Sequence, residues 1–150
     1  IGHNCEIGNN VVLSNSVQVA GHVRIEDCAI VGGCLGIHQF VHIGYLSMIG
    51  GMTRVTRDVP PFCLAEGSPG RLRGLNKVGI KRSGLIEKSN LDLKLLLNTW
   101  LLLFKSDYVI ADAVEVAMSQ ELDFSSRRLC EFVRDSILSN RRGPMPVGNL

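Results

Sequence analysis

Three of the chain's four histidines could act together in proton-transfer chemistry. His3, His22 and His38 recur at intervals close to 18 residues. Imidazole exchanges a proton near neutral pH, so a histidine can be the general base that activates an alcohol. Asn4 follows His3 and could accept a hydrogen bond from its ring, while Gly21 offers an unobstructed backbone N–H for an oxyanion. A base, an orienting group and an oxyanion donor together indicate acyl transfer to an alcohol, provided that the fold brings them together.

A repeat of six residues in the first sixty predicts how they meet. The first position of every hexad is a branched aliphatic residue: Ile1, Ile7, Leu13, Val19, Ile25, Val31, Ile37, Ile43, Ile49 and Val55. An α-helix repeats about every 3.6 residues and a strand every two, so neither gives this pattern. A parallel β-helix does, with three hexads in each triangular coil and the aliphatic residues stacked inside. The second position is mostly small, which we interpret as a fit to the tight corner of the coil.

Coils of this length bring the histidines to one edge of the prism. Coils stack about 4.8 Å apart, which superposes three segments: residues 2–4, 20–22 and 38–40. His3, His22, His38 and Gln39 then share one corner. Side chains of adjacent coils run roughly parallel and no carboxylate is in register, so we expect no metal at this corner. A structural rim of histidines and a general acid–base site both remain open at this point.

The fourth histidine, His42, falls in a different stack. One coil separates it from Arg24, and one more separates Arg24 from Glu6. Charged and polar residues at such spacing favour a cross-strand ladder, so we interpret this stack as structural.

Five stretches resemble the acyl-[acyl-carrier-protein]–UDP-N-acetylglucosamine O-acyltransferases, the hexapeptide-repeat enzymes that begin lipid A biosynthesis. They are "IGHNCEIG", "AGHVRIEDCAIVGG", "GIHQFVHIG", "MIGGMTRVTRDVPPF" and "LNKVGIKRSG". The resemblance runs from residue 1 to about residue 84, in the second half of those enzymes, and the helical tail matches in kind. It implies a left-handed parallel β-helix with a C-terminal α-helical domain. It also implies a homotrimer with sites between neighbouring prisms, and no cofactor.

The resemblance implies a role for nine residues. His3 matches the base that takes the proton of the sugar 3-hydroxyl of UDP-N-acetylglucosamine, which attacks the thioester of a (3-hydroxy)acyl carrier protein. Asn4 matches the neighbour of that base, and the Gly21 N–H matches the oxyanion donor. Six more residues match substrate-binding positions: His22, His38 and Gln39 for the sugar nucleotide, Asn76 and Arg82 for the nucleotide and its phosphates, and Gly51 for acyl length.

Three residues at or near these positions differ from those of the family. Asn4 stands where the best-known members have Asp, and an amide stabilises an imidazolium less than a carboxylate does. Val78 and Ser83 replace a Glu and an Arg that contact the nucleotide. The family's N-terminal coils, with further substrate residues, lie outside this sequence.

The composition indicates the kind of core and the cellular compartment. Apolar residues make up 45% of the 150 but aromatic residues only 5%, so the core must be largely aliphatic. Five cysteines, without zinc or redox spacing, favour reduced thiols and a cytoplasmic location. The apolar run 93–104 is too short to span a membrane and is interpreted as a buried helix.

A basic stretch follows the repeats. The segment from Arg54 to Arg82 contains seven basic and two acidic residues, which gives it a net charge of +5. Such a patch suits an anionic partner. The resemblance implies an acidic acyl carrier protein, and we expect no nucleic acid.

Four segments are predicted. They are a β-helix at 1–60, a connector at 61–76, a helical domain at 77–140 and a disordered tail at 141–150. Helices are expected near 77–82, 90–104, 111–122 and 125–139. Ser125 or Ser126 is the expected N-cap of the last helix.

Other functions remain open at this stage. The chain could be another hexapeptide acyltransferase, dependent on acetyl-CoA or transferring to nitrogen. It could also be an inactive, truncated solenoid that serves only in assembly.

Overall fold

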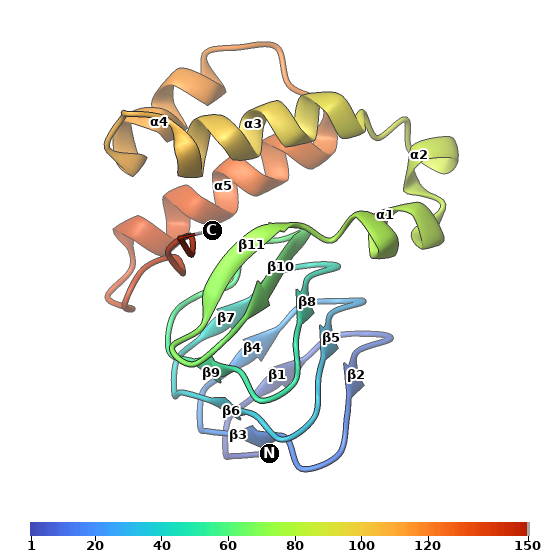
Figure 1. Ribbon diagram of the computed structural model, residues 1–150, viewed down its shortest axis with the longest axis vertical. Helices are drawn as coiled ribbons and strands as arrows, with labels where there is room; N and C mark the ends of the chain where they lie inside the picture. The colour runs from blue at the N-terminus through green and yellow to red at the C-terminus, as the bar shows by residue number, and fades with distance from the viewer. Residues whose placement is uncertain (150) are drawn as a thin grey trace.

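The computed structural model describes residues 1–149, which form a β-solenoid covered at one end by helices (Figure 1). The solenoid is the expected left-handed parallel β-helix. Its two-residue strands are β1 (Glu6–Ile7), β2 (Val12–Leu13), β3 (Gln18–Val19), β4 (Arg24–Ile25), β5 (Ile30–Val31), β6 (Gly36–Ile37), β7 (His42–Ile43), β8 (Met48–Ile49) and β9 (Arg54–Val55).

The predicted register of 18 residues per coil is confirmed. Glu6 pairs with Arg24, and Arg24 pairs with His42, in a parallel sheet of β1, β4 and β7. The aliphatic first positions of the hexads point inward, and from Val19 onward each of them is buried. In the first coil Ile1 and Ile7 are exposed. The aliphatic ladder therefore forms the core of the solenoid, as the repeat indicated.

The expectation that the small second position of the hexad forms the corner is wrong. The turn lies at the third and fourth positions of the hexad, and the fourth has a positive φ. These left-handed residues are Asn4, Asn10, Ser16, His22, Cys28, Cys34, Phe40, Leu46 and Met52. The second position is small for another reason, because the next coil is stacked against it. A Cβ on Gly44 would lie 2.4 Å from the Pro61 nitrogen, and one on Gly32 would lie 2.5 Å from the Gly51 nitrogen.

The segment 61–76, expected as a connector, forms a β-hairpin. Strand β10 (Cys63–Glu66) pairs in parallel with β8, and β11 (Arg71–Leu75) returns antiparallel to β10. The sheet continues past Pro60 and Pro61 because the prolines occupy the corner, while the residues after them keep their backbone N–H groups.

The helices lie near the expected positions. They are α1 (Lys77–Ser83), α2 (Leu85–Lys88), α3 (Leu93–Lys105), α4 (Ile110–Met118) and α5 (Phe124–Leu138). The N-cap of α5 is Asp123, whose carboxylate accepts from the Ser126 N–H at 2.8 Å. Ser125 and Ser126 are buried rather than capping. In the part of the chain that the structure describes, no helix is long and apolar enough to cross a membrane.

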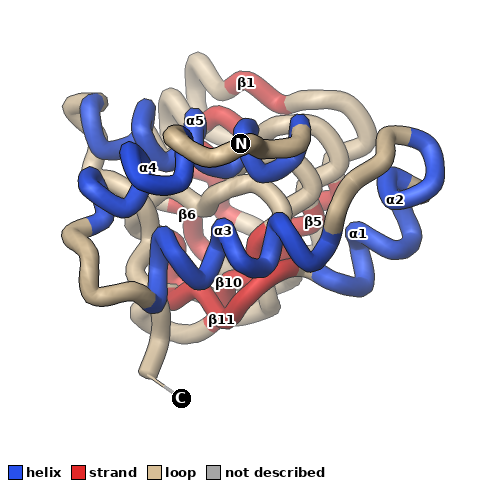
Figure 2. Tube along the Cα trace, turned by 90° about the horizontal axis from the view of Figure 1, so that it is seen from above, coloured by secondary structure: helices blue, strands red, loops and turns tan. Residues whose placement is uncertain are grey.

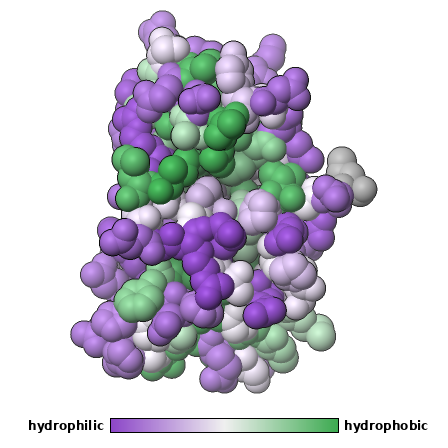
Figure 3. Space-filling view, turned by 90° about the vertical axis from the view of Figure 1, so that its left-hand side faces the viewer, coloured by the Kyte–Doolittle hydropathy of each residue, from purple (hydrophilic) through white to green (hydrophobic). Residues whose placement is uncertain are grey.

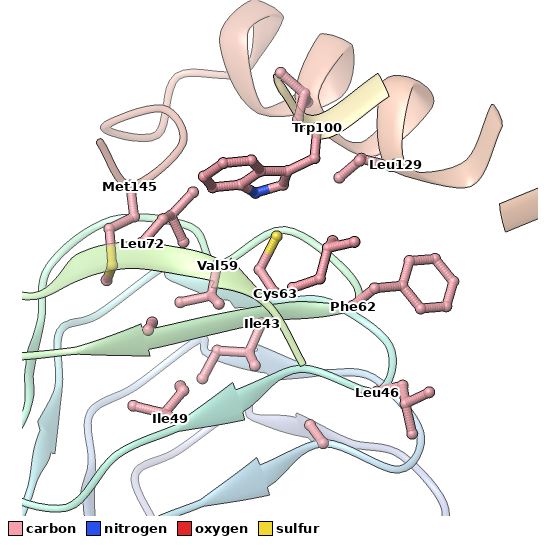
Figure 4. Close-up of a cluster of buried hydrophobic side chains, with 14 of the residues drawn as sticks. Ile43, Leu46, Ile49, Val59, Phe62, Cys63, Leu72, Trp100, Leu129 and Met145 are labelled. Carbon is pink, nitrogen blue, oxygen red and sulfur yellow. The ribbon is translucent and has the colours of Figure 1, made fainter. Parts of the chain in front are cut away.

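Helices α3, α4 and α5 form a layer over the last coil (Figure 2). Trp100 of α3 lies above the hairpin, against Cys63 and Leu72 (Figure 4). Leu129 of α5 and Met145 complete the interface. The two layers therefore share one continuous core.

The expectation of disorder at 141–150 is wrong for residues 141–149, while Leu150 lies outside the described residues. Pro144 and Val147 form parallel bridges with Asp58 and Leu72. Met145 is 1% exposed. A Gly/Pro-rich composition suggested a loose end, but one buried methionine and the free edges of the last coil hold this segment in place.

His42 and Glu26 join the solenoid to α5. Glu26 accepts hydrogen bonds from His42 Nε2 at 2.8 Å and Arg128 Nη2 at 2.9 Å. Burial raises the pKa of such a carboxyl, but the hydrogen bonds and charges of His42 and Arg128 outweigh it and lower the pKa of Glu26 to about 2. His42 thus has the expected register with Glu6 and Arg24. Its ring, however, serves this contact between the layers.

The Glu26 contact should make stability depend on acid pH. Its pKa of about 2 in the folded state is below the ordinary 4.5, so the stabilisation is complete above pH 4.5 and is lost as pH falls toward 2. We expect the wild type to lose roughly 2 kcal/mol more than Glu26→Gln in the free energy of unfolding between pH 6 and pH 3. Urea unfolding at both pH values measures this. Glu121→Gln, at an exposed position, is the control; an equal loss in Glu26→Gln and wild type would contradict the assignment.

Candidate active site

The triangular coil brings the predicted histidine corner together. The His22 N–H donates to the His3 carbonyl at 2.9 Å, and the Phe40 N–H donates to the Gly21 carbonyl at 3.2 Å. These two bonds join three successive coils at one corner. Residues far apart in the sequence are therefore fixed side by side by the backbone itself.

Asn4 sets the proton arrangement on His3. The His3 Nδ1 lies 2.9 Å from the Asn4 Oδ1. A carboxamide oxygen can only accept, so Nδ1 carries the proton and Nε2 keeps its lone pair. Asn4 reaches the ring from a left-handed backbone (φ 57°), a conformation that asparagine tolerates well. Both side chains are exposed, so Nε2 is available to take a proton from a substrate.

Gly21 lies directly against the base. A Cβ at this position would be 2.8 Å from His3 Nε2 and 2.9 Å from Cε1, so only glycine leaves room for the ring. Within residues 1–149, the Gly21 N–H donates to no described acceptor. A free N–H therefore accompanies a free imidazole nitrogen, the combination that acyl transfer requires.

Aromatic contacts hold the corner, and one of them involves a residue that the sequence analysis missed. His22 meets His3 edge-on, with ring centroids 4.9 Å apart and planes at 89°. Phe40 stacks on the other side of His22, at 4.9 Å and 15°. Phe40 could have been identified from the sequence, because it stands in "GIHQF" at the fourth position of a hexad. Within residues 1–149, no group of three or more potential metal-ligating residues occurs.

His38 and Gln39 lie on the same edge, closer to the helices. With His22 they line a cleft of about 620 Å³ between the solenoid and the C-terminal segment. On the face shown in Figure 3, hydrophilic side chains form a band between the helical layer and the coils below. Arg142, from that segment, approaches His38 and was not foreseen.

The remaining predicted residues lie at the other two corners. Asn76 and Arg82 line a second cleft of about 650 Å³ beside α1, together with Val78 and Ser83. Gly51 is exposed at the third corner. The described chain therefore does not bring these residues to the histidine corner.

Asn76 also has a structural task. Its Oδ1 accepts from the Gly79 N–H at 3.0 Å and caps α1, and its Nδ2 donates to the Leu46 carbonyl at 3.0 Å. The side chain is almost fully buried. It thereby fixes α1, and with it Arg82, against the solenoid.

Comparisons with known proteins identify one family. A family model described as "Udp N-acetylglucosamine O-acyltransferase; Domain 2" matches residues 58–145. Acyl-[acyl-carrier-protein]–UDP-N-acetylglucosamine O-acyltransferases from Synechocystis sp. and Gloeothece citriformis are 44% and 42% identical over 147 residues. Those alignments cover 97% of this chain and 52% of each relative. The chain thus spans about half the length of the curated relatives it matches.

Solved structures give the same result. The UDP-N-acetylglucosamine acyltransferase from Campylobacter jejuni superposes with a TM-score of 0.84 at 32% identity, over 98% of this chain and 54% of that one. The Arabidopsis enzyme gives a TM-score of 0.88 at 30% identity, over 95% of this chain and 51% of that one. The resemblance found in the first 84 residues therefore extends through the helical layer.

Proposed function

We propose that this chain, which belongs to the UDP-N-acetylglucosamine O-acyltransferase family, carries the catalytic corner of an enzyme that acylates UDP-N-acetylglucosamine. The donor would be a (3-hydroxy)acyl carrier protein and the acceptor the sugar 3-hydroxyl, in the first step of lipid A biosynthesis. The observation that carries the proposal is that His3 Nε2 lies only 2.8 Å from where a Cβ on Gly21 would stand, while the Gly21 N–H donates to no described acceptor within residues 1–149.

The reaction can be written with these two residues. His3 Nε2 removes the proton of the sugar hydroxyl as its oxygen attacks the thioester carbonyl. The negative charge that develops on the carbonyl oxygen is stabilised by the Gly21 N–H. When the tetrahedral intermediate collapses, the C–S bond breaks and the proton on Nε2 passes to the leaving thiolate. Asn4 keeps the reactive tautomer, although a neutral amide stabilises the imidazolium less than a carboxylate.

A homotrimer is part of the proposal. Asn76, Arg82 and Gly51 are predicted substrate contacts, yet they lie at corners away from His3. A neighbouring copy that presents its α1 corner to this histidine corner would add Asn76 and Arg82 to the site. The arrangement supports a subunit-shared site because a single copy leaves the predicted contacts apart.

The acyl carrier protein is the proposed partner. The basic stretch between Arg54 and Arg82 lies on the last coil, the hairpin and α1, next to the helical layer. Such a surface would attract an acidic protein and raise its rate of encounter. The odd set of five thiols favours a reducing compartment, and we place the reaction in the cytoplasm.

The test is acyl transfer by the full protein that contains this chain. We expect turnover with 3-hydroxyacyl carrier protein and UDP-N-acetylglucosamine, and none with acetyl-CoA as donor. Turnover with acetyl-CoA instead would favour the other hexapeptide acyltransferases. No transfer from either donor by a folded protein would favour a solenoid that serves only in assembly.

A further inference from the structure

The C-terminal segment closes one side of the cleft beside the histidine corner. The solenoid contributes His38, Phe40 and Thr56 to its walls, and the chain after α5 contributes 140–142. The cleft opens on the same edge of the prism as His3. It begins at His22, one coil away from His3 and about 5 Å along the solenoid axis. A substrate held at His3 could therefore extend into it.

Several backbone contacts fix the position of the C-terminal segment. The Asp58 N–H donates to the Gly143 carbonyl at 3.1 Å, and the Met145 N–H donates to the Asp58 carbonyl at 2.7 Å. The guanidinium of Arg57 donates to the Arg142 carbonyl. Residue 142 is thereby held at the mouth of the cleft, although its side chain is exposed.

The cleft carries an excess of positive charge. Four arginines and two aspartates line it, a net formal charge of +2. Arg141 is paired with Asp58 and Asp135, and Arg24 is paired with Glu6. Among residues 1–149, Arg57 and Arg142 form no ion pair with a carboxylate. The uncompensated charge therefore belongs to these two guanidinium groups.

His38 orients the guanidinium of Arg142. The His38 Nδ1 lies 3.1 Å from the Gln39 carbonyl oxygen, which can only accept, so Nδ1 donates. The Nε2 atom lies 3.5 Å from Arg142 Nη2, which can only donate, so Nε2 accepts. One N–H of Arg142 is thus directed at the ring. The others remain open to the cleft.

We propose that Arg142, held by Arg57 and directed by His38, forms a phosphate-binding subsite for one of the two substrates. A planar guanidinium with free N–H groups matches phosphate oxygens in pairs. The identity of the ligand rests on the proposed function, in which both substrates carry phosphate. The carrier protein has a phosphodiester at the root of its pantetheine arm, and the acceptor has the diphosphate of its nucleotide.

Binding of small probes to the full protein tests the subsite without turnover. Isothermal titration calorimetry would compare phosphopantetheine with pantetheine, and UDP with uridine. Arg142→Ala is expected to weaken one phosphate-bearing probe about tenfold and to leave its phosphate-free counterpart unchanged. Arg142→Lys should fall between wild type and Arg142→Ala, because lysine keeps the charge but loses the planar fork. Arg127→Ala removes an exposed arginine outside the cleft and is the matched control.

The pattern of losses identifies the substrate. A loss confined to phosphopantetheine, with a raised KM for the acyl carrier protein, assigns the subsite to the donor. A loss confined to UDP, with a raised KM for the sugar nucleotide, assigns it to the acceptor. Unchanged binding of both probes by a folded Arg142→Ala variant overturns the subsite, even if the wild type transfers acyl groups. Absence of acyl transfer by the wild type would overturn the proposed function instead, and the probe titrations would still decide the subsite.

Discussion

Replacement of His3 by alanine is expected to lower kcat for acyl transfer by roughly 10²- to 10⁴-fold, the usual contribution of a general base. His3 Nε2 is the unprotonated ring nitrogen, because Nδ1–H donates a hydrogen bond to Asn4 Oδ1. The side chain is exposed, so its removal should leave the free energy of unfolding unchanged within about 0.5 kcal/mol. Steady-state kinetics with the carrier protein and the sugar nucleotide measure the loss.

Gly21→Ala tests the role of His3 Nε2 in a second way. The new methyl group would lie 2.8 Å from His3 Nε2, so the ring must move although the histidine is still present. Its kcat should fall by at least tenfold, because displacement of a reacting group by about 1 Å is costly. Asn15→Ala, at the same hexad position on another corner, is the control. Wild-type kcat in His3→Ala would exclude His3 as the base.

Replacement of Asp58 by alanine is expected to lower the free energy of unfolding by about 3 kcal/mol. The carboxylate is 1% exposed and accepts from the His42 N–H at 2.8 Å, the Ser136 hydroxyl at 2.7 Å and Arg141 Nε at 2.9 Å. These donors come from the solenoid, α5 and the C-terminal segment. Alanine would leave the His42 and Ser136 donors buried without an acceptor, and each such group costs about 1–3 kcal/mol.

Urea unfolding at neutral pH measures the effect of Asp58→Ala. Asp107→Ala, at an exposed position without an ion pair in the described structure, should change stability by less than about 0.5 kcal/mol. Equal stabilities of Asp58→Ala and Asp107→Ala would mean that water replaces the lost acceptor at the interface. Asp58 would then not hold the layers together.

The solenoid could be predicted because its physics is local and periodic. A branched residue at every sixth position sets the inward face, and the coil length then places His3, Gly21 and His22 at one corner. The conformation of the corner was not predictable from residue type. Cys28, Phe40 and Leu46 adopt positive φ, although bulky residues rarely do so. Stacking of the coils overrides their preference.

The layer above the solenoid was harder to predict in detail. Helix α5 follows from its apolar stripe, but its cap does not, because Asp123 and Ser125 are both suitable capping residues. The contact between His38 and Arg142 joins positions 104 residues apart. It depends on how the last nine described residues cross the final coil, and no periodicity reaches them. Composition alone suggested disorder there, because the buried Met145 is a single residue in a polar, Gly/Pro-rich segment.

The three-cornered coil also constrains which insertions and deletions this protein can accept. Each hexad turns the chain by one third of a revolution about the solenoid axis. The chain therefore returns to the face of Glu6 only at Arg24, which pairs with it. Loss of a single hexad between His3 and Gly21 would preserve the aliphatic ladder but rotate every later corner by 120°. Gly21 and His22 would then face a different neighbour from His3. The solenoid core can thus accept the insertion or deletion of single hexads. The histidine corner, in contrast, stays assembled only when whole coils are inserted or deleted.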